Sequence, residues 1–447
     1  QHLDMAEDPE AAAAYLAAAE SAAAAYRTEQ ALSLAQRGCM LVSAAAHASL
    51  ACLSGELLQG LGRTEEAIAS FRMAAEKAAA GQPRLRAQLG LAQGLTVLDR
   101  TDEAMTLLER AQREADEQGL LVEQSRIHTL RGNAHFPRGE IDRCLAEHSE
   151  ALRLAEASGA MEEQARALGG LADANYVRGL FRTGGKMFAR CVDICAANGF
   201  RRIDAANLPM LGMIQMWEMQ FDAAMRHMRR AIDLAEQIGH RRAAMIAHHG
   251  LAFLHSELNQ PKQALESGLA ALAIARSLGA RRFVAEGMMF QAQNEFETGD
   301  SRAGQTIREA NEIARETPKF VLPLGLGLAA MIARNVEERT AALAEGERVM
   351  AAGAVSHNVI FFYRYAIEAC LAAADWVGVE RYAAALERGL KEEPLPMTDF
   401  LVTRARAIAA ASRGQKDEKE LTSLLVEANR IGWRVVVPSL EAALAGR

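Results

Sequence analysis

The sequence is poor in the features that indicate enzymatic or metal chemistry. It contains no Walker phosphate loop, no Rossmann glycine pattern and no zinc-protease motif. His248 and His255 are seven positions apart on one predicted helix face, but no carboxylate or cysteine joins them at ligand spacing. No nucleophile, base and orienting group recur at a workable spacing. The sequence therefore predicts no enzymatic activity, no cofactor and no metal site.

Disulfides, nucleic-acid binding and membrane spans are also disfavoured. Only six cysteines occur, none in a CxxC pair, and reduced thiols fit a cytoplasmic protein. With 50 Lys and Arg against 57 Asp and Glu, the net charge of −7 makes nucleic acid an unlikely partner. Residues 38–55 contain polar side chains inside a repeat, and the apolar run 320–333 is too short to span a membrane.

What the chain has instead is a repeating pattern with a period of about 40 residues. Half of the residues are hydrophobic and only 10 are proline, which favours helix throughout. Small residues twelve positions apart recur at Gly132 and Cys144, Ala172 and Gly184, Gly212 and Ala224, Ala252 and Ala264, and Ala292 and Gly304. The predicted second helix of each pair ends at a glycine, namely Gly119, Gly159, Gly199, Gly239 and Gly279. Glycine adopts the left-handed conformation that ends a helix.

Self-similarity at this period indicates a solenoid of helix pairs. Two helices joined by a short turn cannot bury an apolar face alone, so each pair must stack on the next. Small residues at the crossing points allow this close approach, and a leucine there would cost about 1–3 kcal/mol in strain. The sequence therefore predicts an all-α, right-handed superhelical solenoid of about eleven antiparallel helix pairs.

The spacing of the small residues resembles that of the tetratricopeptide repeat, in a variant whose unit is longer than that family's usual one. This longer form is similar to the sensor solenoids of bacterial multidomain signalling ATPases and adenylate or guanylate cyclases. The resemblance covers about residues 9–317. It implies a non-catalytic scaffold that binds a protein or peptide in its concave groove. The start at Gln1 and the helix start at Asp8-Pro9-Glu10 suggest an upstream module of the same polypeptide.

The regularity of the repeats divides the chain into three regions. Residues 1–40 are expected to be entry helices and the junction to an upstream module. Residues 41–317 are the regular repeats, and residues 318–447 are divergent repeats and a C-terminal cap. Within the cap, Trp433 to Val437 is predicted to be extended, followed by a final helix over Pro438–Ala445.

The resemblance implies that the first helix of each pair lines the concave face. Its spacing gives eleven candidate groove residues: Arg126, Asn133, Phe136, Arg166, Asp173, Tyr176, Met213, Met216, Phe253, Met289 and Phe296. Methionine is adaptable and suits surfaces that accept varied partners. The alternative is that the Met and aromatic stripe is simple core. A further polar column, His135, Asn175, Gln215, His255 and Glu295, is either a packing position with local hydrogen bonds or a row that reads a ligand.

Two hypotheses for function remain open. In the first, the solenoid is the sensing C-terminal region of a bacterial signalling protein, either a cyclase or a nucleotide-switch regulator. A ligand in the groove would then bias an upstream domain by a coupling free energy of about 1–3 kcal/mol. In the second, the chain is a free-standing adaptor that binds peptides or helices of partner proteins. Both hypotheses expect a cytoplasmic protein with no membrane partner.

Overall fold

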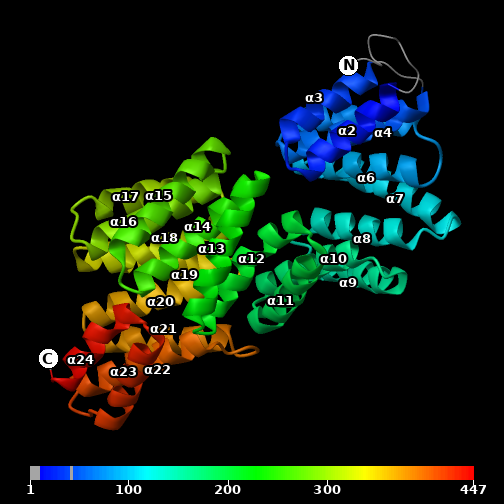
Figure 1. Cartoon of the computed structure of the whole chain (residues 1–447). Helices are drawn as coiled ribbons and strands as arrows, with labels where there is room; N and C mark the ends of the chain where they lie inside the picture. The colour runs from blue at the N-terminus through cyan, green and yellow to red at the C-terminus, as the bar shows by residue number, and fades with distance from the viewer. Residues whose placement is uncertain (1–10, 41–43, 447) are drawn as a thin grey trace. The chain divides into compact units, whose positions relative to one another are not determined.

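The computed structural model describes residues 11–40 and 44–446, and within these ranges the chain contains no β-strand. The described residues form 23 α-helices, and successive helices pack side by side in pairs (Figure 1). The predicted all-α solenoid and its eleven helix pairs are therefore confirmed. Among the described helices, none has both the length and the apolar character needed to cross a membrane.

The pairs follow one another along the chain with short turns between them. The first six are α2 (Ala11–Ala24) with α3 (Thr28–Cys39), α4 (Ala44–Gly60) with α5 (Thr64–Lys77), α6 (Gln82–Val97) with α7 (Thr101–Glu117), α8 (Leu121–His135) with α9 (Ile141–Ser158), α10 (Met161–Arg178) with α11 (Phe181–Asn198), and α12 (Arg201–Trp217) with α13 (Phe221–Ile238). The last five are α14 (Arg241–Glu257) with α15 (Pro261–Ser277), α16 (Arg281–Glu297) with α17 (Ala303–Ala314), α18 (Pro318–Ile332) with α19 (Val336–Ala351), α20 (His357–Ala372) with α21 (Trp376–Gly389), and α22 (Pro396–Ser412) with α23 (Glu418–Ile431).

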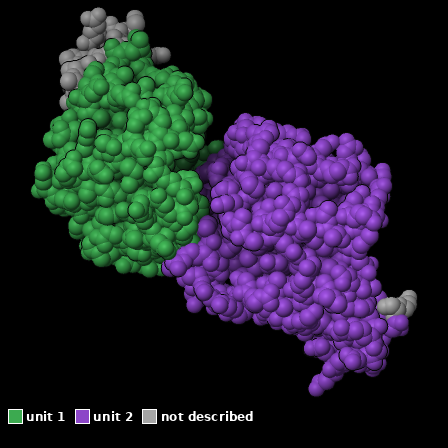
Figure 2. Space-filling model, turned by 180° about the vertical axis from the view of Figure 1, so that it is seen from behind, with its two compact units in different colours: residues 1–174, 190–203, 237–239 green, residues 175–189, 204–236, 240–447 purple. Residues whose placement is uncertain are grey.

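The chain forms two compact units, coloured separately in Figure 2. Unit 1 comprises residues 1–174, 190–203 and 237–239, and unit 2 comprises residues 175–189, 204–236 and 240–447. The three regions expected from the regularity of the repeats remain a prediction, and the units divide the chain at other positions. The helix start expected at Asp8-Pro9-Glu10 lies outside the described residues.

Glycines end the second helices as the sequence predicts. Positive φ angles of +64°, +69°, +74°, +69° and +63° occur at Gly119, Gly159, Gly199, Gly239 and Gly279. Such angles are strained for residues that carry a Cβ atom, which explains the choice of glycine. The turn after α14 instead has Asn259, with φ +54°. Asparagine is among the few side chains that tolerate this conformation.

The small columns lie at the helix crossings. Gly132, Ala172, Gly212 and Ala252 are all buried. In unit 1, a Cβ atom added at Gly132 would lie 2.5 Å from Nε2 of His148, whose ring packs between α8 and α10. The same columns that allow helices to approach also make room for this buried ring.

One prediction about the C-terminal cap is wrong and another is confirmed. Trp433 to Val437 is not extended, because Arg434–Val436 forms a 3-10 helix, η1, that leads into α24 (Val437–Leu444). The helix predicted over Pro438–Ala445 is thus present within a residue or so at each end. Trp433 is fully buried, and its side chain fixes the start of this cap. The β-branched residues of this segment favour a strand, but the packing of Trp433 in the core outweighs that preference.

Candidate functional site

The first helices of unit 1 share a solvent-connected cavity. Its volume is about 350 Å³. It is lined by Ala48, Ser49 and Cys52 of α4, Gln82, Pro83, Arg86 and Leu89 of α6, Val122, Glu123 and Arg126 of α8, and Glu163 of α10. Residues one repeat apart fall at the same place on successive first helices, so the repeat brings Glu123 and Glu163 onto one wall. The wall of the cavity is therefore built from equivalent positions of successive repeats.

Three arginines of unit 1, which occupy the same position in successive repeats, differ in their partners. Arg86 binds both carboxylate oxygens of Glu56, at 2.7 Å from Nε and 2.7 Å from Nη2. Arg166 binds Glu162 through Nη2, while its Nε lies 3.6 Å from Oε1 of Glu163. Arg126 is half-buried and makes no hydrogen bond or ion pair within the described residues. Its guanidinium group is therefore available at the cavity.

Glu163 is the most unusual group of the cavity. Only 5% of the residue is exposed, and Oε2 has no hydrogen-bond partner in the described structure. Burial raises the pKa of this carboxyl, although the nearby charges of Arg166 and Arg126 oppose the shift. A buried acceptor without a donor costs about 1–3 kcal/mol, and such atoms in native structures call for an explanation.

The remaining candidates of unit 1 lie along the same helices. Asn133 is exposed on α8, two turns beyond Arg126 and on the same face. Phe136 follows α8 directly and is half-buried. Asp173 on α10 is half-buried near Cys144 and adds to the burial that raises the pKa of that thiol to about 12. Arg126, Asn133 and Asp173 thus offer polar groups along one wall.

The candidates of unit 2 have different surroundings. Met216, Phe253 and Met289 are buried, with exposed fractions of 0%, 1% and 0%. In this structure they are core residues, which was the alternative interpretation of the Met and aromatic stripe. A partner could reach them only by displacing other parts of the chain. Met213 is half-buried, and Phe296 is 42% exposed.

Aromatic side chains of α20 cover this stripe. The ring of Phe361 lies 5.3 Å from Phe253 and 6.4 Å from Trp217, measured between ring centres. Tyr176, the remaining candidate, stacks on Trp217 at 5.7 Å and lies 5.8 Å from His357. Edge and stacked arrangements at these distances are favourable. Two of the predicted groove residues of unit 2, Phe253 and Tyr176, therefore contact a helix that lies well downstream of them in the sequence.

Buried polar contacts hold the C-terminal helices of unit 2 in place. Nη2 of Arg364 lies 2.5 Å from Oε1 of Glu257, and both residues are buried. The indole Nε1 of Trp433 donates to the other oxygen of Glu257 at 2.6 Å. The hydroxyl of Tyr365 donates to Oε1 of Gln293 at 2.9 Å. These contacts join α14 and α16 to α20 and to the residue just before η1.

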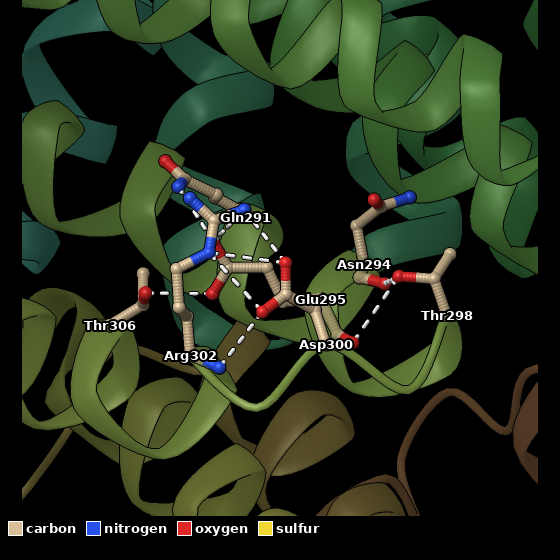
Figure 3. Close-up of polar contacts among 7 residues, drawn as sticks. All are labelled: Gln291, Asn294, Glu295, Thr298, Asp300, Arg302 and Thr306. Atoms are coloured by element: carbon tan, nitrogen blue, oxygen red, sulfur yellow. Dashed lines mark hydrogen bonds and ion pairs between the residues drawn. The ribbon is translucent and has the colours of Figure 1, made fainter.

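The polar column makes local hydrogen bonds, as the first of its two interpretations expects. At the turn between α16 and α17, Oε2 of Glu295 accepts from Thr306 at 2.7 Å, and Oε1 accepts from Gln291 at 2.8 Å (Figure 3). His255 bonds Gln260 at 2.7 Å. The equivalent contacts in the other repeats are His135 with Glu140, Asn175 with Met187, and Gln215 with His227. Through these bonds the column contacts either the turn that follows each first helix, at Glu140 and Gln260, or the next helix, at Met187, His227 and Thr306.

Among the described residues, no group of three or more His, Cys, Asp or Glu side chains is placed to hold a metal ion. Burial raises the pKa of the Cys52, Cys144 and Cys370 thiols to about 12. Since the thiolate is the reactive form, these cysteines behave as small apolar side chains.

Comparison with known proteins supports the fold. The sequence matches no protein-family model, and no curated protein matches it. Its structure is similar to that of a Rap protein complexed with Competence and Sporulation Factor, with 14% identity and a TM-score of 0.54 over 86% of this chain and 98% of that one. A Signal Transduction ATPase with Numerous Domains from Pyrococcus horikoshii, which has a tetratricopeptide repeat sensor, gives 16% identity and a TM-score of 0.48 over 65% of this chain and 44% of that one. The chain has the fold of a tetratricopeptide-type helical repeat protein.

Sequence reasoning missed two groups of residues. Glu163 follows Glu123 by one repeat, so the period could have placed both on one wall, but neither stands in the columns chosen as exposed. The contact of Glu257 with Arg364 and Trp433 joins residues far apart in the sequence and has no signal in the repeat. Only the folded chain shows that these three residues meet.

Proposed function

We propose that this chain is a non-catalytic interaction scaffold whose unit 1 binds an extended segment of a partner protein. The observation that carries the proposal is the pair formed by Arg126 and Glu163 beside an open cavity: within the described residues, the Arg126 guanidinium and Oε2 of Glu163 lack hydrogen bonds. A guanidinium group donates to carbonyl or carboxylate oxygens, and a carboxylate accepts from N–H groups. An extended peptide presents both kinds of group on its main chain.

An extended segment suits this cavity better than a helix does. A helix is about 10–12 Å wide and has its main-chain groups already bonded, so it needs a broad apolar groove. The apolar stripe that could offer such a groove, Met216, Phe253 and Met289, is covered in unit 2 by other parts of the chain. The cavity of unit 1 is small, with a volume of about 350 Å³, and both charged and apolar side chains line it. It has room for a short stretch of a peptide.

The finer role that we propose is sensing within a bacterial signalling protein, a cyclase or a nucleotide-switch regulator. The resemblance of the long repeat unit to the sensor solenoids of such proteins supports it. A partner segment bound to unit 1 would then change the equilibrium of an upstream domain. A free-standing adaptor is the second candidate, and the same cavity would serve it. The gene sequence upstream of Gln1 distinguishes the two, because an ATPase or cyclase domain there is expected only for the sensor.

Peptide selection tests the scaffold. A phage library of short random peptides is selected on the immobilised full chain, and the enriched peptides are synthesised and measured by calorimetry. We expect Arg126→Ala to weaken their binding at least tenfold. Arg110→Ala on α7 is the control, since Arg110 is exposed and does not line the cavity. If no peptide is enriched, or if both variants bind like the native chain, the proposed peptide site is wrong.

A further inference from the structure

Two arginines and two glutamates line the cavity of unit 1, but one of the arginines is already paired with a glutamate outside the lining. Arg86 is paired with Glu56, and Arg166 is bonded to Glu162. Arg126 is then left beside two carboxylates, Glu123 and Glu163, whose nearest ion-pair contact among the described residues is the 3.6 Å from Glu163 to Arg166. When they are ionised, the three lining groups that remain, Arg126, Glu123 and Glu163, sum to one negative charge. A ligand of the cavity is therefore expected to bring a positive one.

We propose that the cavity is an ammonium-binding site, in which Glu163 accepts a hydrogen bond from a primary ammonium group and Arg126 holds a neighbouring carbonyl oxygen. This inference rests on the proposed function, within which the ammonium belongs to the bound segment of the partner. The ammonium is that of a lysine side chain or of the segment's N-terminus, which present the same chemistry. Both can form a charge-assisted hydrogen bond with the buried carboxylate.

The unsatisfied oxygen of Glu163 is the independent sign of a ligand. Only 5% of the surface of this residue is exposed, and the residue lines the cavity. A carboxylate held out of water without a donor is strongly disfavoured unless an opposite charge reaches it. Arg166 does not meet this need, because its Nε lies 3.6 Å from Oε1 and leaves Oε2 without a partner in the described structure.

The walls of the cavity suit the apolar part of such a group. Val122 is 40% exposed, and Pro83 and Leu89 line the cavity beside it. A volume of about 350 Å³ is at the small end of ligand sites, which span about 300–1,000 Å³. Lysine packs its methylene stem along apolar surface while its charged end reaches a polar group. The cavity thus combines a place for the stem with an acceptor for the charge.

The first experiment uses small probes on the full-length chain. Binding of n-butylammonium, n-butanol and butyrate is measured by saturation-transfer difference NMR at pH 7.5. We expect n-butylammonium alone to bind, and Glu163→Gln to weaken it at least tenfold. Glu109→Gln on α7 is the control, because Glu109 is exposed and lies outside the cavity. Glu163→Gln is expected to fold, with an unchanged or higher Tm, because it removes a buried charge whose ion pair with Arg166 is long, at 3.6 Å.

The second experiment distinguishes a lysine side chain from an N-terminus as the source of the ammonium group. It also distinguishes failure of the ammonium site from failure of peptide binding. Four versions of the peptide Lys-Leu-Ala-Leu-Ala are compared by calorimetry, with the N-terminus free or acetylated and with lysine or norleucine. Loss of binding on acetylation assigns the site to an N-terminus, and loss with norleucine assigns it to a lysine. Equal binding of all four would overturn the ammonium site while leaving peptide binding intact. Binding of n-butylammonium through Glu163 without binding of any peptide would contradict the proposed function alone.

If n-butylammonium does not bind, or binds equally to native chain and Glu163→Gln, the ammonium site is wrong. A dependence on pH provides a further check. Because burial raises the pKa of Glu163, its carboxyl is protonated at a higher pH than an exposed glutamate. Binding of n-butylammonium should therefore weaken as the pH falls from 7.5 to 5, and a signal independent of pH would contradict the role of this carboxylate.

Discussion

The two units are built from the same repeat but use the first helices of their pairs differently. In unit 1 these helices border a cavity with charged and apolar walls, where Arg126 and Oε2 of Glu163 make no hydrogen bond among the described residues. In unit 2 the Met and aromatic stripe is buried: Met216 is 0% exposed, and Phe253 packs against Phe361 of α20. The first helices of unit 1 thus have a wall that a partner could contact, whereas those of unit 2 are part of a core.

This difference shows that the repeat determines which residues share a wall, whereas what covers the wall depends on the rest of the chain. Methionine and phenylalanine at the inner columns are suited either to a partner or to a returning segment of the chain. Burying polar and charged side chains under such a segment is unfavourable unless each of them forms a hydrogen bond or ion pair. Asn133 of unit 1 therefore remains exposed and Arg126 half-buried, whereas Met216 and Phe253 of unit 2 are core.

The largest expected effect comes from breaking the contact that holds the C-terminal helices of unit 2. Arg364→Ala leaves the carboxylate of Glu257 buried without its cation, so we expect unit 2 to lose about 3–5 kcal/mol of stability. Unit 1 should be unaffected. Urea denaturation followed by unit-resolved hydrogen exchange measures both.

The matched control for this change is Arg406→Ala. Arg406 also forms two ion pairs, with Glu380 and Glu387, but its side chain is 38% exposed. Exposed pairs contribute about 0–1 kcal/mol, so this variant should be nearly neutral. Equal losses in the two variants would mean that the buried contact does not hold the C-terminal helices.

The next effect tests how tightly the helices of unit 1 pack around the buried ring of His148. A Cβ atom added at Gly170 would lie 2.2 Å from Cε1 of the buried His148 ring. We therefore expect Gly170→Ala to destabilise unit 1 by about 1–3 kcal/mol through overpacking. The midpoint of urea unfolding, read from hydrogen exchange in unit 1, measures it.

Gly268→Ala in unit 2 is the control for the glycine substitution. The nearest atom to its added Cβ is Cβ of Ala252, at 3.8 Å, which is ordinary contact. Alanine is favoured over glycine inside a helix by about 0.5–1 kcal/mol, so this variant should be as stable as the native chain or more so. A similar loss at both positions would indicate that the ring of His148 is not the obstacle.

Lowering the pH should reduce the folding stability of both units, because each contains a buried histidine. Burial lowers the pKa of His148 in unit 1 to about 4 and that of His249 in unit 2 to about 3, against an ordinary value near 6.5. As the pH falls below 6.5, the unfolded chain binds protons that the folded chain does not, so stability decreases. Between pH 7.5 and 5.5 each histidine should account for about 1 kcal/mol.

Single substitutions assign this pH dependence to each unit. His148→Gln should flatten the dependence of unit 1 alone, and His249→Gln that of unit 2 alone, in denaturation curves measured at several pH values. In unit 2 the carboxylate of Glu286 lies 3.6 Å from Nδ1 of His249 and faces the same ring. An unchanged pH slope in either variant would mean that the histidine concerned does not titrate on unfolding.

The fold could be predicted from the sequence because local signals repeat. Gly159 and Gly199 end helices with positive φ, and Gly132 and Ala172 are buried at crossings, as their spacing of one repeat implies. The candidate site could be predicted only in part. Arg126 was found because it recurs with the repeat, but the burial of Phe253 depends on Phe361, which lies several helices further along the chain. No periodic pattern carries that information.

The smallest expected effect on stability comes from substituting the exposed candidate groove residues. Only at such positions can a loss of partner binding be distinguished from a loss of stability. Phe296 is 42% exposed and Asn133 is exposed, so Phe296→Ser and Asn133→Ala should each change stability by less than about 0.5 kcal/mol. Met289 is fully buried on the same helix as Phe296, and Met289→Ala should cost about 2–5 kcal/mol. Thermal unfolding of the three variants checks this order. A loss of partner binding in Met289→Ala would reflect destabilisation, whereas a loss in Asn133→Ala with unchanged Tm would identify a contact on the wall of unit 1.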